Sequence, residues 1–227
     1  MGHSWSAIYF QEKFISEGID ADFAPYTLDH VALQPQLDGY NVTIPYKEQI
    51  IPLLEGLDPI AQEIGAVNVV KTFPKTIGYN TDWLGFITSI RNLIRPTDKH
   101  ALILGTGGAA KAVHYGLKVL GIHSQFVSRT ARSGLLTYED INREIIEANT
   151  IIVNATPVGM FPHVNECPKI PYVYLTERHL LFDCIYNPPL TKFLSQGEAH
   201  GCRTMNGLEM LHLQADAAWK IWNSNIE

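Results

Sequence analysis

The pattern of apolar and polar residues changes partway along the chain. In the second half, short apolar runs alternate with segments whose apolar residues recur at helical spacing. Strands are expected at 101–104, 124–128, 150–154 and 180–185, and helices at 109–120, 138–148 and 191–200. Because strands and helices alternate, this half predicts a parallel sheet with helices on both faces.

The first part of the chain is less regular and predicts a separate α/β unit. Helices are expected at 6–17, ending at Gly18, from Pro45 to about Leu54, and from Asp82 to about Leu93; strands are expected at 21–26, 39–45 and 65–70. The amphipathic stretch 207–222 predicts a long last helix that packs back on this unit.

We therefore predict an α/β protein of two domains. Residues 83–205 form a dinucleotide-binding domain, a Rossmann-like doubly wound parallel sheet. Residues 1–82, completed by 206–227, form a smaller α/β domain. Arg95-Pro96-Thr97-Asp98 interrupts the pattern just before the first strand of the parallel sheet.

A glycine-rich turn follows the apolar run 101–104. The turn reads Gly105-Thr106-Gly107-Gly108-Ala109 and leads directly into helical spacing. A strand, a glycine turn and a helix start form a cradle for a pyrophosphate, because the helix N-terminus offers free N–H groups. The alternative is a tight turn that binds no ligand.

The residues after the next expected strand distinguish between nucleotides. An NAD site usually has a carboxylate about 20 residues past the glycines. This chain instead has Ser128-Arg129-Thr130-Ala131-Arg132. Two guanidinium groups suit an adenosine 2′-phosphate, so the segment favours NADP over NAD and over S-adenosylmethionine. The alternative is a solvated basic loop.

Composition excludes several classes of protein. A net charge of −6 over 227 residues argues against nucleic acid as a partner. The chain has no apolar run long enough to span a membrane and no signal-peptide pattern. The 3 cysteines are scattered and the histidines form no cluster, so we expect a cytoplasmic protein without a metal site.

Seven motifs together resemble the shikimate dehydrogenase family and cover almost the whole chain. They are Gly-His-Ser-Trp-Ser (2–6), Asn-Val-Thr-Ile-Pro-Tyr-Lys (41–47), Gly-Ala-Val-Asn (65–68), Gly-Tyr-Asn-Thr-Asp-Trp-Leu-Gly (78–85), Gly-Thr-Gly-Gly-Ala (105–109), Asn-Ala-Thr-Pro-Val-Gly-Met (154–160) and Asn-Gly-Leu-Glu-Met-Leu-His-Leu-Gln (206–214). The resemblance implies reduction of 3-dehydroshikimate to shikimate with NADPH, on the route to chorismate and the aromatic amino acids.

The resemblance also implies that the domain of residues 1–82, completed by 206–227, binds the substrate, and it implies roles for individual residues. Lys47 and Asp82 are the catalytic pair, since oxidation of an alcohol requires removal of a proton from oxygen. Taken singly, they would be an exposed lysine and a carboxylate at a helix start. The substrate-binding residues are Ser4, Ser6, Thr43, Asn68, Tyr186 and Gln214. Thr156, Cys184 and Gly207 line the nicotinamide end, with Cys184 as a packing residue.

The sequence departs from the family pattern at its beginning. Members normally have a strand before Gly-His-Ser-x-Ser, whereas this sequence starts at Met1. Ala7 stands where many relatives have proline, and Ser128 where asparagine is usual. Two other hypotheses stay open: a quinate/shikimate dehydrogenase of broader specificity, and a catalytically impaired paralogue that binds the dinucleotide. We expect a small-molecule substrate and a monomer or homodimer.

Overall fold

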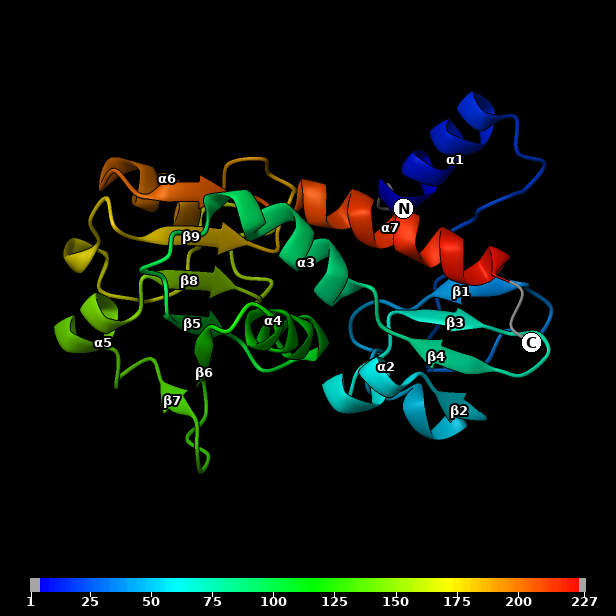
Figure 1. Cartoon of the computed structure of the whole chain (residues 1–227), viewed down its shortest axis with the longest axis horizontal. Coiled ribbons are helices and arrows are strands. Elements are labelled where there is room, and N and C mark those ends of the chain that lie inside the picture. The colour runs from blue at the N-terminus through cyan, green and yellow to red at the C-terminus, as the bar shows by residue number, and fades with distance from the viewer. Residues whose placement is uncertain (1–4, 225–227) are drawn as a thin grey trace. The chain divides into compact units, whose positions relative to one another are not determined.

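The computed structural model of the protein describes residues 5–224 and contains two compact units. One unit comprises the described residues up to Thr81 together with those from Leu211 onward. The other unit is Asp82–Met210. Figure 1 shows the elements of both, coloured along the chain.

The second unit is built on a six-stranded sheet with the order β10-β9-β8-β5-β6-β7. Every pair of neighbouring strands is parallel, which confirms the predicted fold class. Figure 1 shows β9, β8 and β5 side by side in this sheet. The strands are β5 (His100–Leu104), β6 (His123–Ser128), β7 (Leu136–Thr137), β8 (Ile151–Asn154), β9 (Leu180–Asp183) and β10 (Arg203–Met205).

Alternate residues of the central strands enter two separate cores. Ile103, Val153 and Phe182 pack with the first pair of helices of this unit, α3 and α4. Leu104 and Leu181 face the opposite core, which α5 and α6 help to form. Burial on both faces explains why these strands are continuous apolar runs in the sequence. The helices are α3 (Asp82–Ile90), α4 (Gly108–Val119), α5 (Arg143–Ala148) and α6 (Lys192–Ala199), with 3-10 turns η2 (Arg91–Leu93) and η3 (Tyr172–Tyr174).

The first unit contains a four-stranded mixed sheet with the order β1-β3-β4-β2. The β1–β3 and β3–β4 pairs are antiparallel, whereas β2 and β4 are parallel. Its strands are β1 (Gly39–Asn41), β2 (Gly56–Leu57), β3 (Val69–Lys71) and β4 (Ile77–Tyr79), and its other elements are α1 (Trp5–Glu17), α2 (Pro59–Ile64) and the 3-10 turn η1 (Ile51–Leu53).

The last helix, α7 (Leu208–Asn223), contributes its residues from Leu211 onward to the first unit, whereas its first residues, to Met210, belong to the second. An aromatic cluster joins it to α1: Phe14 lies 4.9 Å from Trp219 between ring centroids, and Phe10 lies 5.6 Å from Trp222. Trp222 also donates its indole N–H to the carbonyl of Val70 at 3.0 Å. Aromatic packing and this hydrogen bond fix α7 within the unit.

Several of the expected elements are wrong in place or extent. The strand expected at 39–45 ends at Asn41, and the strand expected at 65–70 begins only at Val69, because Gly65 is the C-cap of α2. Residues 21–26 form no strand: Phe23 stacks on Phe10 rather than joining a sheet, and Tyr26 is exposed. Turns replace the helix expected from Pro45, and a single 3-10 turn follows them. The helix expected from Tyr138 begins only at Arg143, after Asn142 caps the N–H of Ile145 at 3.0 Å.

Candidate functional site

The predicted cofactor residues of the second unit gather at one edge of its sheet. Leu104 at the end of β5 is paired in register with Asn154 at the end of β8, and Asn154 with Asp183 at the end of β9. The parallel strands therefore end together, and their following loops lie at the same edge. Those loops carry the glycine turn, the arginine segment 128–132, Thr156 and Cys184. Such an edge is where α/β sheets bind ligands.

The glycine turn combines a backbone conformation that favours glycine with open space at the start of α4. Gly105 has a φ of +112°, which strongly favours glycine, and an added Cβ would lie 3.1 Å from the carbonyl oxygen of Ala155. Gly107 is the N-cap residue of α4, and an added Cβ there would have no atom within 4 Å. Open space thus faces the start of a 12-residue helix, whose first N–H groups have no intrahelical acceptor. Thr106 lies between Gly105 and Gly107, and Gly108 and Ala109 are the first two residues of α4.

The arginine segment begins at the buried end of β6. Ser128 is 8% exposed, and its hydroxyl accepts a hydrogen bond from the N–H of Thr130 at 3.1 Å. This bond turns the chain outward, so that Arg129 and Arg132 are exposed. Both guanidinium groups are accessible to an anion in solvent.

Gly207, predicted at the nicotinamide end, allows a close approach of two chain segments. Its N–H donates to the carbonyl of Ile185 at 3.0 Å, and an added Cβ would lie 2.3 Å from the carbonyl oxygen of Cys184. Glycine is therefore required by packing at this position. Tyr186 follows in the same loop and is half-buried, and burial raises its pKa above the usual value.

A buried polar network that we had not anticipated underlies these loops. Asp183 is fully buried and accepts from the side-chain amide of Asn154 at 3.0 Å and from the hydroxyl of Thr191 at 2.6 Å. Burial raises the pKa of Asp183 to about 6, although these hydrogen bonds oppose the shift. Part of this network could have been found from the sequence, because Asn154 is the first residue of the motif 154–160.

In the first unit, the structure brings together two amides that are 146 residues apart. Asn68 Nδ2 donates to Gln214 Oε1 at 3.2 Å and to the hydroxyl of Thr81 at 2.9 Å. Asn68 Oδ1 accepts the backbone N–H of Thr81 at 2.7 Å. Both predicted amides are buried, at 3% and 7% exposure, so their orientation is set by the protein. Thr81 is a member of this group that the prediction missed, although it lies in the motif 78–85.

Lys47 lies beside this group through its backbone. Its carbonyl accepts the N–H of Val67, the residue before Asn68, at 2.8 Å. The lysine is half-buried in the turns that follow β1, and Thr43 is exposed in the same stretch. Ser6 is half-exposed in the first turn of α1, whereas Ser4 lies outside the described residues.

Asp82 is the first residue of α3 and belongs to the second unit. It is 5% exposed, which is low for a carboxylate at a helix start. The position itself favours a negative charge, because the helix dipole presents its positive end there. It follows Thr81 directly in the chain.

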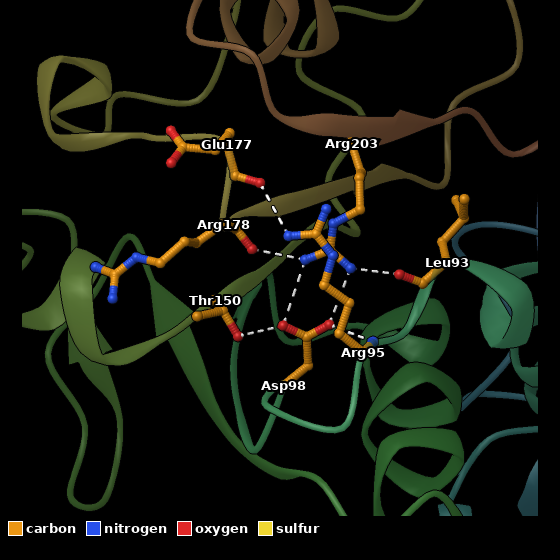
Figure 2. Close-up of polar contacts among 7 residues, drawn as sticks. All are labelled: Leu93, Arg95, Asp98, Thr150, Glu177, Arg178 and Arg203. Atoms are coloured by element: carbon orange, nitrogen blue, oxygen red, sulfur yellow. Dashed lines mark hydrogen bonds and ion pairs between the residues drawn. The ribbon is translucent and has the colours of Figure 1, made fainter.

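A second charged cluster lies at the opposite edge of the parallel sheet, where its strands begin (Figure 2). Asp98 accepts from Arg203 at 3.0 and 3.3 Å, from Thr150 at 2.8 Å and from the N–H of Arg95 at 2.7 Å. Its side chain has no exposed surface. Because the partners of Asp98 are all groups of the protein itself, this cluster stabilises the fold and is not part of the candidate site.

Comparison with known proteins places these observations in a family. A family model described as the shikimate dehydrogenase substrate binding domain matches residues 1–70. The chain is 36% identical to the shikimate dehydrogenase (NADP(+)) of Caldicellulosiruptor saccharolyticus, over 97% of this chain and 88% of the relative. It is also 36% identical to the enzyme of that name from Desulforamulus reducens, over 81% of this chain and 70% of the relative.

Solved structures agree with the sequence relatives. The shikimate dehydrogenase of Aquifex aeolicus superposes with a TM-score of 0.86 at 33% identity, covering 99% of this chain and 90% of that one. The Thermus thermophilus enzyme, solved with NADP(H) and shikimate, superposes with a TM-score of 0.86 at 29% identity, covering 99% of this chain and 90% of that one. Within residues 5–224, no helix is long and apolar enough to cross a membrane.

Proposed function

The chain belongs to the shikimate dehydrogenase family, and we propose that it catalyses the NADP-dependent interconversion of shikimate and 3-dehydroshikimate, in the pathway to chorismate and aromatic amino acids. The observation that carries the proposal is the gathering of the glycine turn, the arginine segment and Cys184 at one edge of a parallel sheet. A dinucleotide site requires this arrangement.

We assign the two units different roles. Asp82–Met210 would bind NADP, and the unit that ends at Thr81 and resumes at Leu211 would bind the substrate. The family model that matches residues 1–70 supports the second assignment. The buried pair of Asn68 and Gln214 supports it further, because amides both donate and accept and so suit ring hydroxyls.

The residues at the sheet edge fit the dinucleotide. Open space beside Gly107 leaves room for a pyrophosphate at the start of α4, and exposed Arg129 and Arg132 would hold the 2′-phosphate. Ser128 and Thr130 would shape that loop, while Thr156, Cys184 and Gly207 would line the nicotinamide end. When bound, NADP supplies the hydride acceptor for alcohol oxidation.

The remaining roles concern the substrate and its proton. Lys47 and Asp82 would transfer the proton of the reacting hydroxyl, because a hydride can leave carbon only as the oxygen loses its proton. Ser4, Ser6 and Thr43 would bind the carboxylate through hydroxyl donors, and Tyr186 would contact the substrate. Three free cysteines suit the reducing cytoplasm, where we place the protein as a monomer or homodimer.

The test is production of NADPH, followed by absorbance, from shikimate and NADP with the purified chain. Lys47→Ala and Asp82→Asn are expected to lower kcat by roughly 10²–10⁴-fold, the usual contribution of a proton-transfer group. The control is Lys75→Ala, an exposed lysine in the loop between β3 and β4, which should leave kcat unchanged.

An inactive wild-type chain, or full activity in both variants, would contradict the proposal. The same assay with quinate distinguishes a narrow enzyme from one of broader specificity, by the ratio of kcat/KM for the two substrates. Binding of NADP without turnover of either substrate would instead indicate the impaired paralogue.

A further inference from the structure

The carboxylate of Asp183 connects separate segments at the sheet edge where the cofactor is proposed to bind. Its Oδ1 accepts the side-chain amide of Asn154 at 3.0 Å and the backbone N–H of Ile185 at 3.0 Å. Its Oδ2 accepts the hydroxyl of Thr191 at 2.6 Å. Asn154, Asp183 and Thr191 are all fully buried.

Each of these donors belongs to a segment that matters for the site. Asn154 Oδ1 also accepts the N–H and the hydroxyl of Thr156, at 3.1 and 2.6 Å, so it shapes the loop after β8. Ile185 lies between Cys184 and Tyr186 in the loop after β9. Through these two bonds one carboxylate holds both loops.

The third donor extends the network to the start of a helix. Thr191 is the N-cap residue of α6, and its hydroxyl accepts the N–H of Leu194 at 3.3 Å while donating to Asp183. The segment from Asp183 to Thr191 is therefore closed by side-chain bonds at both ends. Its shape depends on an acceptor at both oxygens of residue 183.

Both oxygens of Asp183 act only as acceptors, which an ionised carboxylate alone provides. A protonated acid would place a donor on Oδ2, opposite a hydroxyl that already donates. Thr191 would then have to rotate its proton away. Among the described residues, no cationic side chain pairs with Asp183, so hydrogen bonds alone hold its charge.

Asp183 is the residue of this network that changes its charge near pH 6, as the groups around it show. Tyr172 of η3 faces it, and burial, then the nearby Cys167 and Asp183, raise the pKa of that phenol well above the usual value. Lys192, which follows Thr191 on α6, is exposed and donates to the carbonyl of Asn165 at 3.3 Å. From β8, the neighbouring side chain is the uncharged amide of Asn154.

We propose that ionised Asp183 is a positioning residue of the dehydrogenase reaction: it holds the Thr156 and Cys184–Tyr186 loops in the shape that receives the nicotinamide end, and protonation releases them. The inference rests on the proposed function, because those loops are assigned to the cofactor there. Asp183 acts through its hydrogen bonds and does not itself contact the reacting atoms.

The test compares Asp183→Asn with the wild type by kcat and by KM for NADP across the acid and neutral range. Since the pKa of Asp183 is about 6, wild-type kcat/KM for NADP should decrease as the pH is lowered through that value. Asparagine presents a donor to Thr191 at every pH. The variant should therefore show a roughly tenfold lower kcat/KM for NADP at neutral pH, and it should lack the inflection near pH 6.

A second variant keeps the test valid should Asp183→Asn fail to fold. Thr191→Val removes the hydroxyl that donates to Oδ2, and Thr191→Ser restores it. We expect Val to raise KM for NADP several-fold and Ser to return it to the wild-type value. Thr204→Val is the matched control, because it removes a hydroxyl–carboxylate bond to Glu198 on the exposed surface.

Two outcomes would overturn the inference: wild-type KM, kcat and pH profile in folded Asp183→Asn, or unchanged KM in Thr191→Val. A ligand-free measurement separates this failure from failure of the proposed function. Backbone amide NMR shifts of Thr156 and Ile185 should titrate together near pH 6 in the wild type and stay constant in Asp183→Asn. If these shifts titrate but the wild type turns over no shikimate, only the proposed function fails.

Discussion

The buried ion pair between Arg203 and Asp98 allows a quantitative prediction for Arg203→Met. The guanidinium makes two hydrogen bonds to the Asp98 carboxylate and further bonds to the carbonyls of Leu93 and Arg178, as Figure 2 shows. Methionine keeps much of the apolar stem and removes every donor. The carboxylate would remain buried with only the Arg95 N–H and the Thr150 hydroxyl as partners.

The expected loss of stability is large. Removing one partner of a buried ion pair typically costs about 3–5 kcal/mol, because the other charge stays buried without compensation. Asp98 has no exposed side-chain surface and Arg203 has 15%, so this range applies rather than the ~0–1 kcal/mol of a surface pair. A domain with about 5–15 kcal/mol of total stability would lose a substantial part of it.

The effect should depend on pH in a defined direction. Burial alone raises the pKa of Asp98, but the bonds from Arg203, Arg95 and Thr150 outweigh it, and the pKa lies below its usual value. This stabilisation is present above the unfolded pKa of about 3.9 and is lost as pH falls through the folded pKa. In Arg203→Met, burial dominates and Asp98 takes up a proton more readily. The difference in unfolding free energy between wild type and variant should therefore shrink toward about pH 5.

Urea unfolding followed by circular dichroism, at about pH 7 and about pH 5, measures both quantities. Arg178→Met is the control, since Figure 2 shows that its guanidinium points away from the cluster, and it should cost under about 0.5 kcal/mol. Adding Asp98→Asn to Arg203→Met should recover stability by removing the unpaired charge. A loss below about 1 kcal/mol at neutral pH, or a loss that does not change with pH, would refute the reasoning.

Three further substitutions test the cofactor site. Gly107→Ala should leave the unfolding free energy within about 0.5 kcal/mol, because its Cβ meets nothing within 4 Å, yet weaken NADP binding by calorimetry; unchanged affinity would exclude the cradle. Gly207→Ala should lower the unfolding free energy by about 1–3 kcal/mol, because its Cβ would lie 2.3 Å from the carbonyl oxygen of Cys184; a stable, fully active variant would contradict this geometry. Arg129→Ala should raise KM for NADP by about tenfold or more while changing KM for NAD little, and equal losses would argue against the 2′-phosphate assignment.

Much of the second unit could be predicted from local pattern. The apolar run 101–104 is continuous because its strand is buried on both faces, and the glycines that follow it mark a sharp turn into a helix. The strand expected at 180–185 was too long, since β9 stops at Asp183 and the next residues turn into a loop. Composition could not show that this last strand residue is a fully buried acid.

Local pattern was a poorer guide in the first unit. The stretch 21–26 was expected to be a strand, but Asp22 and Pro25 are residue types depleted in strands, and Phe23 is held by aromatic packing instead. The short strand β2 and the helix α2 were missed because each has too few residues to show a period.

The sequence by itself determined the alternation of strand and helix, the glycine turn and the motifs that identify the family, because each depends on residues close together in the chain. Only the tertiary structure decided which distant residues meet. It places Asn68 against Gln214, 146 residues away, and Asp98 against Arg203, 105 residues away. It also made Asp183 a buried charge that hydrogen bonds alone stabilise. Burial and hydrogen bonding between remote segments are properties of the packed chain, and no local periodicity encodes them.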